Sequence, residues 1–240
     1  MKKILVAALA VSAASSMAVV KPYVGASVGY TLGQPSGVLG TDATSSSPEN
    51  IYGTYAGKAI PLGVHAGVID NDVVGAQLDL SYLLGQEQDI SKQTDYKIKS
   101  TLTGVLLTPS IVVAAKGPFT PYAKFGLVFG FGLTDEQKVD GAKAEYTGGT
   151  AFGFEGALGG EFKVQERLGL TVELAAQSLK WAPTDAKITG NNLSKSYTLE
   201  DDGKSDGDIE SLASATGSTA RKPVYDLSNL AIKVGFNYHM

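Results

Sequence analysis

Apolar and polar residues alternate with a period of two along most of the chain. In the segment 23–32, for example, Val, Ala, Val, Tyr and Leu fall on one face, and Tyr, Gly, Ser, Gly and Thr fall on the other. Such alternation indicates β-strands, because a helix would repeat every ~3.6 residues. Clear alternation is present in the segments 23–32, 60–68, 74–82, 122–131, 152–164, 168–177 and 230–240.

A further strand is expected at 100–115, although apolar residues there occupy both alternating positions and Pro109 lies in the middle, so its two faces stay unassigned. The connections between strands alternate in length. Those at 70–72, 116–121 and 165–167 are short, whereas those at 33–57, 85–99, 132–149 and 179–228 are long and polar. The sequence therefore predicts an all-β fold, an eight-stranded antiparallel up-and-down transmembrane β-barrel with long extracellular loops and short periplasmic turns.

The composition of the two strand faces indicates which face meets lipid. One face is apolar and almost free of charge, as acyl chains require, while the other is mainly Gly, Ser and Ala, which suits the narrow lumen of such a barrel. A water-soluble barrel would carry Lys, Glu and Thr on the second face, so a secreted lipocalin-like carrier is only a lesser alternative. Aromatic residues form two expected interfacial belts: Tyr30, Tyr82, Phe131 and Phe152 toward the long loops, and Phe162, Phe236 and Tyr238 toward the other end.

Composition and the N-terminal segment narrow the class of protein. The 240 residues include no cysteine, which excludes disulfide frameworks, thiolate metal sites and cysteine nucleophiles. The formal net charge of −4 argues against nucleic-acid binding. Lys2 and Lys3 precede a short apolar run and small residues near Ala18, which are the parts of a secretory signal peptide. We therefore expect a signal peptide at 1–18 and a barrel at 19–240.

Charged residues on the small-residue face are the main candidates for function. Because a buried charge persists only when it is paired and hydrogen-bonded, we expect these side chains to form a network in the lumen. Counting from the short-turn end, Lys124 and Glu161 are expected at similar depth on neighbouring strands, as are Glu173 and Lys233. The favoured interpretation is a lumen plugged by charged pairs, and the alternative is a gated path for ions or solutes. The predicted network comprises Asp79, Lys124, Glu155, Glu161, Glu173 and Lys233.

Motifs of enzymes and metal sites are weak in this sequence. Residues 25–29 match the G-x-S-x-G motif, but they lie inside a predicted strand rather than at a strand–turn–helix junction, and the only histidines are His65 and His239. The acidic stretch 200–210 misses the spacing of a calcium loop, because Lys204 stands where an Asp is required. A solvated loop tip is the favoured interpretation of that stretch, and weak binding of divalent cations or lipopolysaccharide is the alternative. We predict no catalytic residue, metal or cofactor.

The long segment 179–228 contains two large aromatic residues, Trp181 and Tyr197, whose place the pattern leaves open. They either extend strands beyond the membrane or line a short hairpin.

Several runs resemble the outer-membrane β-barrel domain family that includes OmpA, OmpX, OmpW and the opacity proteins. Residues 21–25 (KPYVG) are similar to its opening strand, and 121–123 (PYA) with the following Gly/Phe alternation are similar to a mid-barrel strand. Residues 158–164 (LGGEFKV) and 168–173 (LGLTVE) resemble its penultimate hairpin. The end, 234–240 (VGFNYHM), is similar to the signal read by the barrel assembly machinery, with Phe236, Tyr238 and Met240 as the alternating residues, although it ends in Met rather than Phe or Trp.

This resemblance implies a location more firmly than an activity. We expect a monomer, exported by a Sec-type route to the outer membrane of a Gram-negative-type (diderm) bacterium, with both termini periplasmic. Its partners would be outer-membrane lipid and lipopolysaccharide, the assembly machinery during biogenesis, and an extracellular ligand of the long loops. The expected role is structural or surface-interacting, and the alternative is a narrow porin-like channel for small or hydrophobic solutes, as in the OmpW-like branch.

Overall fold

The computed structural model describes residues 20–33, 38–42, 49–52, 58–70, 73–89, 99–115, 117, 119–139, 142–190, 193–200, 219–221 and 224–240. The predicted signal peptide (1–18) and all but the first residue of the acidic stretch 200–210 lie outside these ranges. Within them, no helix is long and apolar enough to cross a membrane.

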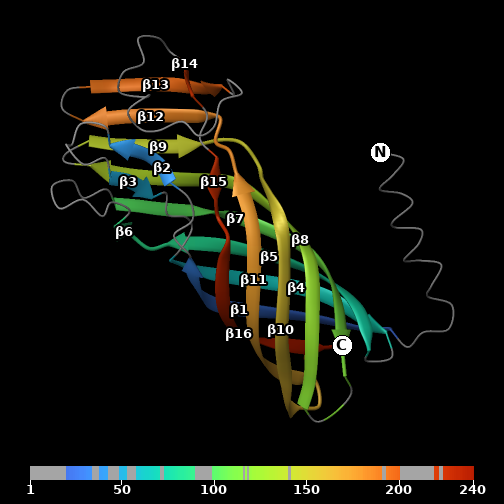
Figure 1. Cartoon of the computed structure of the whole chain (residues 1–240). Helices are drawn as coiled ribbons and strands as arrows, with labels where there is room; N and C mark the ends of the chain where they lie inside the picture. Colours follow the sequence, from blue (N-terminus) through green and yellow to red (C-terminus); the bar gives the residue numbers. More distant parts are fainter. Residues whose placement is uncertain are drawn as a thin grey trace, which may run out of the picture.

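A closed barrel of antiparallel strands forms the body of the molecule (Figure 1). Each strand pairs with its neighbour in sequence order around the barrel, and the last strand pairs with the first, Val28 lying opposite Val234. All the predicted strands are confirmed. The barrel strands are β1 (Val20–Gly33), β4 (Ala59–Asp70), β5 (Val74–Gly85), β7 (Lys99–Ala114), β8 (Phe119–Val139), β10 (Ala151–Gln165), β11 (Leu168–Trp181) and β16 (Asn229–His239).

On the long-loop side, the sheet of the barrel continues beyond one wall through additional strands, which we call the wall extension. The 21-residue strand β8 runs past the barrel and pairs there with β9 (Ala142–Thr147). The sheet continues through β12 (Asp185–Gly190), β13 (Leu193–Glu200) and β14 (Thr219–Arg221), which lie side by side at the top of Figure 1. Shorter elements are β2 (Val38–Asp42) paired with β3 (Glu49–Tyr52), β6 (Gln88–Asp89) on β7, and β15 (Tyr225–Asp226) on β11.

The segments 132–149 and 179–228 are therefore not simply polar loops, and the structure corrects that expectation. The wall extension buries several apolar side chains almost fully, including Leu133, Tyr146 and Ala186, beside the polar Asp135 and Gln137. Burial of these side chains favours strands over solvated loops. Trp181 is the last residue of β11, so the alternative of an extended strand holds for it. Tyr197 lies in the β12–β13 hairpin, so the hairpin alternative holds for it.

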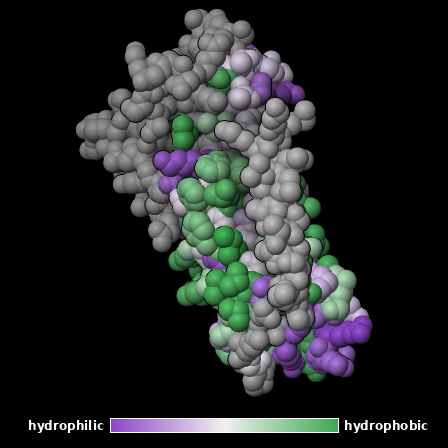
Figure 2. Space-filling view, turned by 90° about the vertical axis from the view of Figure 1, so that its right-hand side faces the viewer, coloured by the Kyte–Doolittle hydropathy of each residue, from purple (hydrophilic) through white to green (hydrophobic). Residues whose placement is uncertain are grey.

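The outward face of the barrel is apolar, which confirms the predicted orientation. Leu158, Phe125 and Ile111 expose 67%, 61% and 61% of their surface, as a side chain facing acyl chains does. Figure 2 shows apolar side chains spread over the barrel wall, with hydrophilic ones toward both of its ends. All seven aromatic residues of the two predicted belts are exposed on this outward face.

Strand β7, whose faces the sequence left unassigned, points Ile111 and Val113 outward and Leu102, Leu106 and Val112 into the lumen. Both of its faces are apolar because the lumen itself is apolar at this strand's outer end. Its pairing with β8 skips positions 108–109, where proline has no N–H to donate.

Candidate functional site

The lumen is the candidate site, and its two ends differ in chemistry. Toward the short turns it holds charged and hydrogen-bonding side chains that line a cavity. Toward the long loops it is filled by apolar and aromatic side chains, which we call the outer core. The outer core comprises Ala59, Leu83, Leu102, Leu106, Val128, Leu133, Tyr146, Ala151, Leu179, Trp181, Ala186, Tyr197, Leu199, Tyr225 and Leu227.

Glu173 of β11 is the centre of an ion network in the inner half of the lumen. Its carboxylate lies 2.7 Å from Lys124 Nζ and 3.4 Å from Lys233 Nζ. Lys233 also pairs with Glu155 at 3.1 Å, while Lys124 lies 3.8 Å from Asp79. These five residues come from β5, β8, β10, β11 and β16, so the network ties together most of the barrel wall.

Whether two lumen charges meet depends on the register between the strands that carry them. Glu173 and Lys233 are cross-strand partners in the β11–β16 ladder, as their depth in the sequence predicts. Lys124 instead lies opposite Ala157, and Glu161 lies opposite Thr120. The expected closeness of Lys124 and Glu161 is therefore wrong, because these side chains sit four residues apart along the paired strands.

Glu161 belongs to a second cluster at the inner mouth. Its carboxylate accepts a hydrogen bond from Asn237 Nδ2 at 2.6 Å and lies 2.7 Å from His239 Nε2. The Oδ1 atom of Asn237 in turn lies 2.6 Å from His65 Nε2. The ring of Tyr23 packs near both imidazoles, at centroid distances of 6.3 Å and 5.8 Å.

Sequence reasoning did not select Asn237 or Tyr23, and it placed His239 only at the chain terminus. The available signal was the alternation of β16, because Asn237 and His239 share the lumen face with Lys233. Alternation gives the face of a side chain but not its partner on another strand.

Two tyrosines form opposite parts of the inner lumen wall, and glycines make room for them. A Cβ atom at Gly67 would lie 2.5 Å from the Tyr23 hydroxyl, and one at Gly159 would lie 2.4 Å from Tyr122 Cζ, both too close for a side chain. The Tyr23 hydroxyl donates to Gln77 at 2.7 Å and the Tyr122 hydroxyl donates to Glu173 at 3.1 Å. The small-residue face thus holds phenol groups in contact with the ion network.

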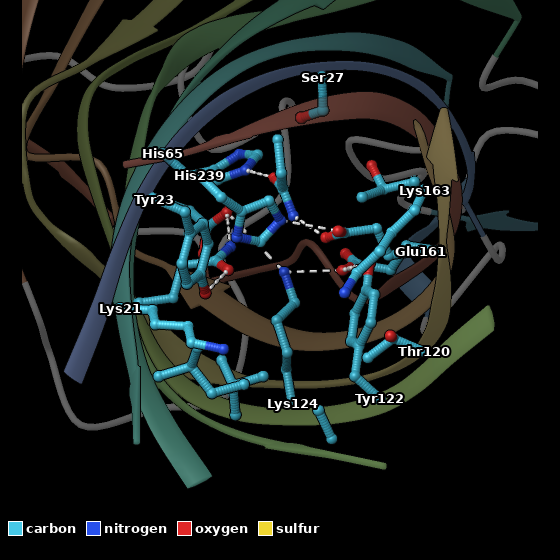
Figure 3. A pocket seen from close by; sticks show the side chains of 18 of the residues that line it. Lys21, Tyr23, Ser27, His65, Thr120, Tyr122, Lys124, Glu161, Lys163 and His239 are labelled. Carbon is cyan, nitrogen blue, oxygen red and sulfur yellow. Dashed lines mark hydrogen bonds and ion pairs between the residues drawn. The ribbon is translucent and has the colours of Figure 1, made fainter. Parts of the chain in front are cut away.

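A cavity of about 240 Å³ lies between these tyrosines and extends to the short-turn end of the barrel. Its inner wall includes Asp79, Lys124 and Glu173, whereas the exposed Lys163 and Glu166 line it near the turn. Figure 3 shows Lys124 reaching between Tyr23 and Tyr122, with His65 and His239 on the opposite side.

The outer core closes the other half of the lumen. Val128, Leu179 and Trp181 are each exposed by 1% or less. Trp181 packs on Tyr225 with a ring-centroid distance of 5.2 Å and donates from Nε1 to the Gly148 carbonyl at 2.8 Å. The indole thus satisfies its polar atom while filling the barrel mouth with apolar surface.

Asp135 of β8 is a buried acid at the edge of the outer core, past Phe131 and therefore outside the membrane-spanning part of the strand. It accepts hydrogen bonds from Ser100 Oγ at 2.6 Å and from Gln137 Nε2 at 2.8 Å. The structure shows no ion pair for it within the described residues. Burial raises the pKa of Asp135 to about 6, against the lowering effect of these two hydrogen bonds.

The described residues form neither a nucleophile elbow at the G-x-S-x-G run nor a metal cluster. Ser27 of the G-x-S-x-G run lies within β1, paired with Gly235 and Gly63, and not at a strand–turn–helix junction. In the described part of the chain, no three His, Cys, Asp or Glu side chains are grouped so that they could hold a metal ion.

Comparison with known proteins places this barrel among its relatives. Residues 4–200 match the model of the outer membrane protein β-barrel domain family. The chain belongs to this family. None of the curated proteins matches the sequence.

Solved structures of outer-membrane proteins share the fold. OprG from Pseudomonas aeruginosa matches with 14% identity and a TM-score of 0.59, over 92% of this chain and 95% of OprG. A major outer membrane protein from Thermus thermophilus matches with 12% identity and a TM-score of 0.53, over 92% of this chain and 100% of its own.

Family membership, together with the apolar outward face, places the protein in the outer membrane of a Gram-negative-type bacterium. The secreted lipocalin-like carrier is therefore excluded. Phe236, Tyr238 and Met240 point outward from the end of β16, exposed by 46%, 43% and 62%, and their role as an assembly signal stays a prediction.

Proposed function

We propose that this protein is a closed, non-enzymatic outer-membrane barrel with a structural or surface-interaction role. The observation that carries this proposal is the filling of the lumen by two successive layers. A solute that passed the ion network around Glu173 would next meet the outer core around Trp181.

The two layers resist opening for different reasons. Removing one partner from a buried ion pair leaves the other charge uncompensated, at a cost of about 3–5 kcal/mol. Opening the outer core exposes large apolar side chains to water, at about 25 cal/mol per Å². The movement of a single side chain in either layer therefore does not open a path through the lumen.

The wall extension supports a role at the cell surface. Its outward face carries a ladder of charged side chains, with Lys143 2.5 Å from Glu136 and 3.2 Å from Glu145. Its inward face adds Leu133, Tyr146 and Tyr197 to the outer core. This arrangement keeps a polar, ordered surface in contact with the medium, where an extracellular ligand of the loops would bind.

A narrow channel is the second candidate, and the cavity at the inner mouth favours it. That cavity already opens the inner part of the lumen from the periplasmic side. Conduction would then require the ion network around Glu173 and the outer core to move.

Planar-bilayer recordings on the purified, refolded protein test the choice. The proposal predicts no discrete current steps from the wild-type protein. A variant with Trp181→Ala and Leu106→Ala, which empties part of the outer core, serves as the matched control and should conduct more often. Regular openings of the wild-type protein would support the channel and overturn the closed barrel.

A further inference from the structure

We propose that the cavity at the inner mouth of the barrel binds a small organic cation through a primary ammonium group, with Asp79 as its main anionic partner. The proposal rests on the shape of the cavity, on the balance of charge in the lumen, and on the hydrogen bonds of Asp79. It concerns the periplasmic face and does not depend on whether the lumen conducts.

The cavity is enclosed by the barrel wall and accessible from one side. Its volume of about 240 Å³ is enough for an amine with a short alkyl chain. Ser27, Val112 and Thr171 line it together with the rings of Tyr23 and Tyr122, so it offers apolar surface and aromatic faces beside its charged groups. Aromatic faces attract cations and repel anions.

The charges of the ion network around Glu173 do not balance. Its three carboxylates, those of Asp79, Glu155 and Glu173, face the two ammonium groups of Lys124 and Lys233, so three negative groups minus two positive groups leave an excess of one. Glu161 lies outside this network, and its carboxylate contacts Asn237 and His239 instead. One negative charge of the network then remains, and an uncompensated buried charge is costly.

Asp79 is the carboxylate with the poorest compensation. Lys124 lies 3.8 Å from its Oδ1 atom but only 2.7 Å from Glu173, so the lysine is bound mainly to Glu173. The Oδ1 atom also accepts a hydrogen bond from Gln77 Nε2 at 2.7 Å. The Oδ2 atom is buried and has no hydrogen-bond partner.

A primary ammonium group fits this arrangement because it carries a positive charge and three N–H donors on a narrow stem. The described residues hold no cluster that would coordinate a metal ion, which favours an organic cation over a metal. Lys21 and Lys163 at the exposed rim oppose entry, but solvent and salt screen their charges more than they screen the more deeply placed Asp79.

The test uses the refolded full-length barrel in detergent micelles at constant ionic strength, with butylammonium, butanol and butyrate as probes of equal length. Side-chain amide NMR signals report binding, because the Gln77 amide donates to Asp79. We expect a saturable shift of this signal with butylammonium and none with butyrate. Asp79→Asn should weaken butylammonium binding about tenfold or more, Asp79→Glu should restore it, and Lys163→Gln should leave it unchanged or tighten it.

Several outcomes would overturn the proposal. Equal binding of butanol would indicate an apolar crevice, and displacement of butylammonium by an equal concentration of potassium would indicate unspecific counter-ions. Unchanged affinity in Asp79→Asn, shown to be folded by its heat-modifiable migration on gels, would exclude Asp79 as the partner. Absence of any shift with butylammonium in the wild-type protein would exclude the site.

Discussion

The two halves of the lumen close the same barrel by different means. The inner half depends on a few charged atoms at distances such as 2.7 Å between Lys124 and Glu173, and it leaves a cavity beside them. The outer half depends on dense apolar packing around Trp181. Ion pairs need a particular register between strands, whereas apolar side chains need only burial, so the two halves should respond differently to substitution.

The largest expected effect is the loss of packing in the outer core. Trp181→Ala should lower the free energy of unfolding by about 3–5 kcal/mol, because it removes a fully buried indole and leaves a cavity. Denaturant unfolding in detergent measures this effect. Phe125→Ala is the control, since that side chain is 61% exposed to acyl chains that can fill the space, and it should cost clearly less.

Breaking the ion network should have the next largest effect. Lys233→Met removes the ammonium group shared by Glu155 and Glu173. Glu173 keeps Lys124, but the buried Glu155 loses its ion pair, with an expected loss of about 3 kcal/mol. A lower temperature for the loss of heat-modifiable migration on gels would show it. Lys180→Met changes an exposed lysine on a neighbouring strand and should leave that temperature unchanged. Equal behaviour of the two variants would count against the pairing.

The buried acid Asp135 should make the stability of the outer half depend on pH. The raised pKa of Asp135 means that the folded state holds this proton more tightly than the unfolded state. Its contribution to stability is therefore fully present below the usual carboxyl pKa of about 4 and is lost as the pH rises through about 6. Asp135→Asn should therefore stabilise the barrel near neutral pH by on the order of 1–3 kcal/mol and flatten the pH dependence of unfolding.

Glu136 is the matched control for this prediction. It is the next residue along β8, and the hydrogen bond from Lys143 lowers its pKa. Its exposed pairing favours folding above the unfolded pKa and is lost as the pH falls, so Glu136→Gln should not reproduce the change made by Asp135→Asn. Similar pH profiles for both variants would contradict the assignment to the buried acid.

The smallest expected effect tests a single hydrogen bond. Tyr122→Phe removes the hydroxyl that donates to Glu173 at 3.1 Å, while Lys124 stays in place. The loss should be about 1 kcal/mol, measured by the same denaturant unfolding. If Tyr122→Phe lowered the free energy of unfolding as much as Lys233→Met does, the hydroxyl, and not the ammonium groups, would be the main group that stabilises the Glu173 carboxylate.

Much of the barrel could be predicted from the sequence because a strand that separates lipid from a narrow lumen must alternate. The strands, their outward faces and the lumen position of Glu173 follow from this rule. It failed for β7, where the outer core makes the inward side chains, such as Leu106, as apolar as the outward ones.

The partners of the lumen charges were harder to predict. The distance between Lys124 and Glu161 depends on how β8 and β10 are staggered, which a short turn does not reveal in the sequence. The wall extension was missed for another reason. Its strands are short and occur within long polar segments, so the burial of Tyr146 or Tyr197 becomes visible only when the sheet is assembled.

The closure of the lumen can be tested directly by cysteine labelling, because the natural chain has no cysteine. Ala231 is 5% exposed and packs with Ala157 and Ala175 in the lumen wall, whereas Thr120 lines the cavity. In the refolded barrel, a small charged thiol reagent should modify Thr120→Cys and leave Ala231→Cys unmodified. Modification of both at similar rates would show that solutes pass the ion network, and would contradict closure of the lumen by two layers.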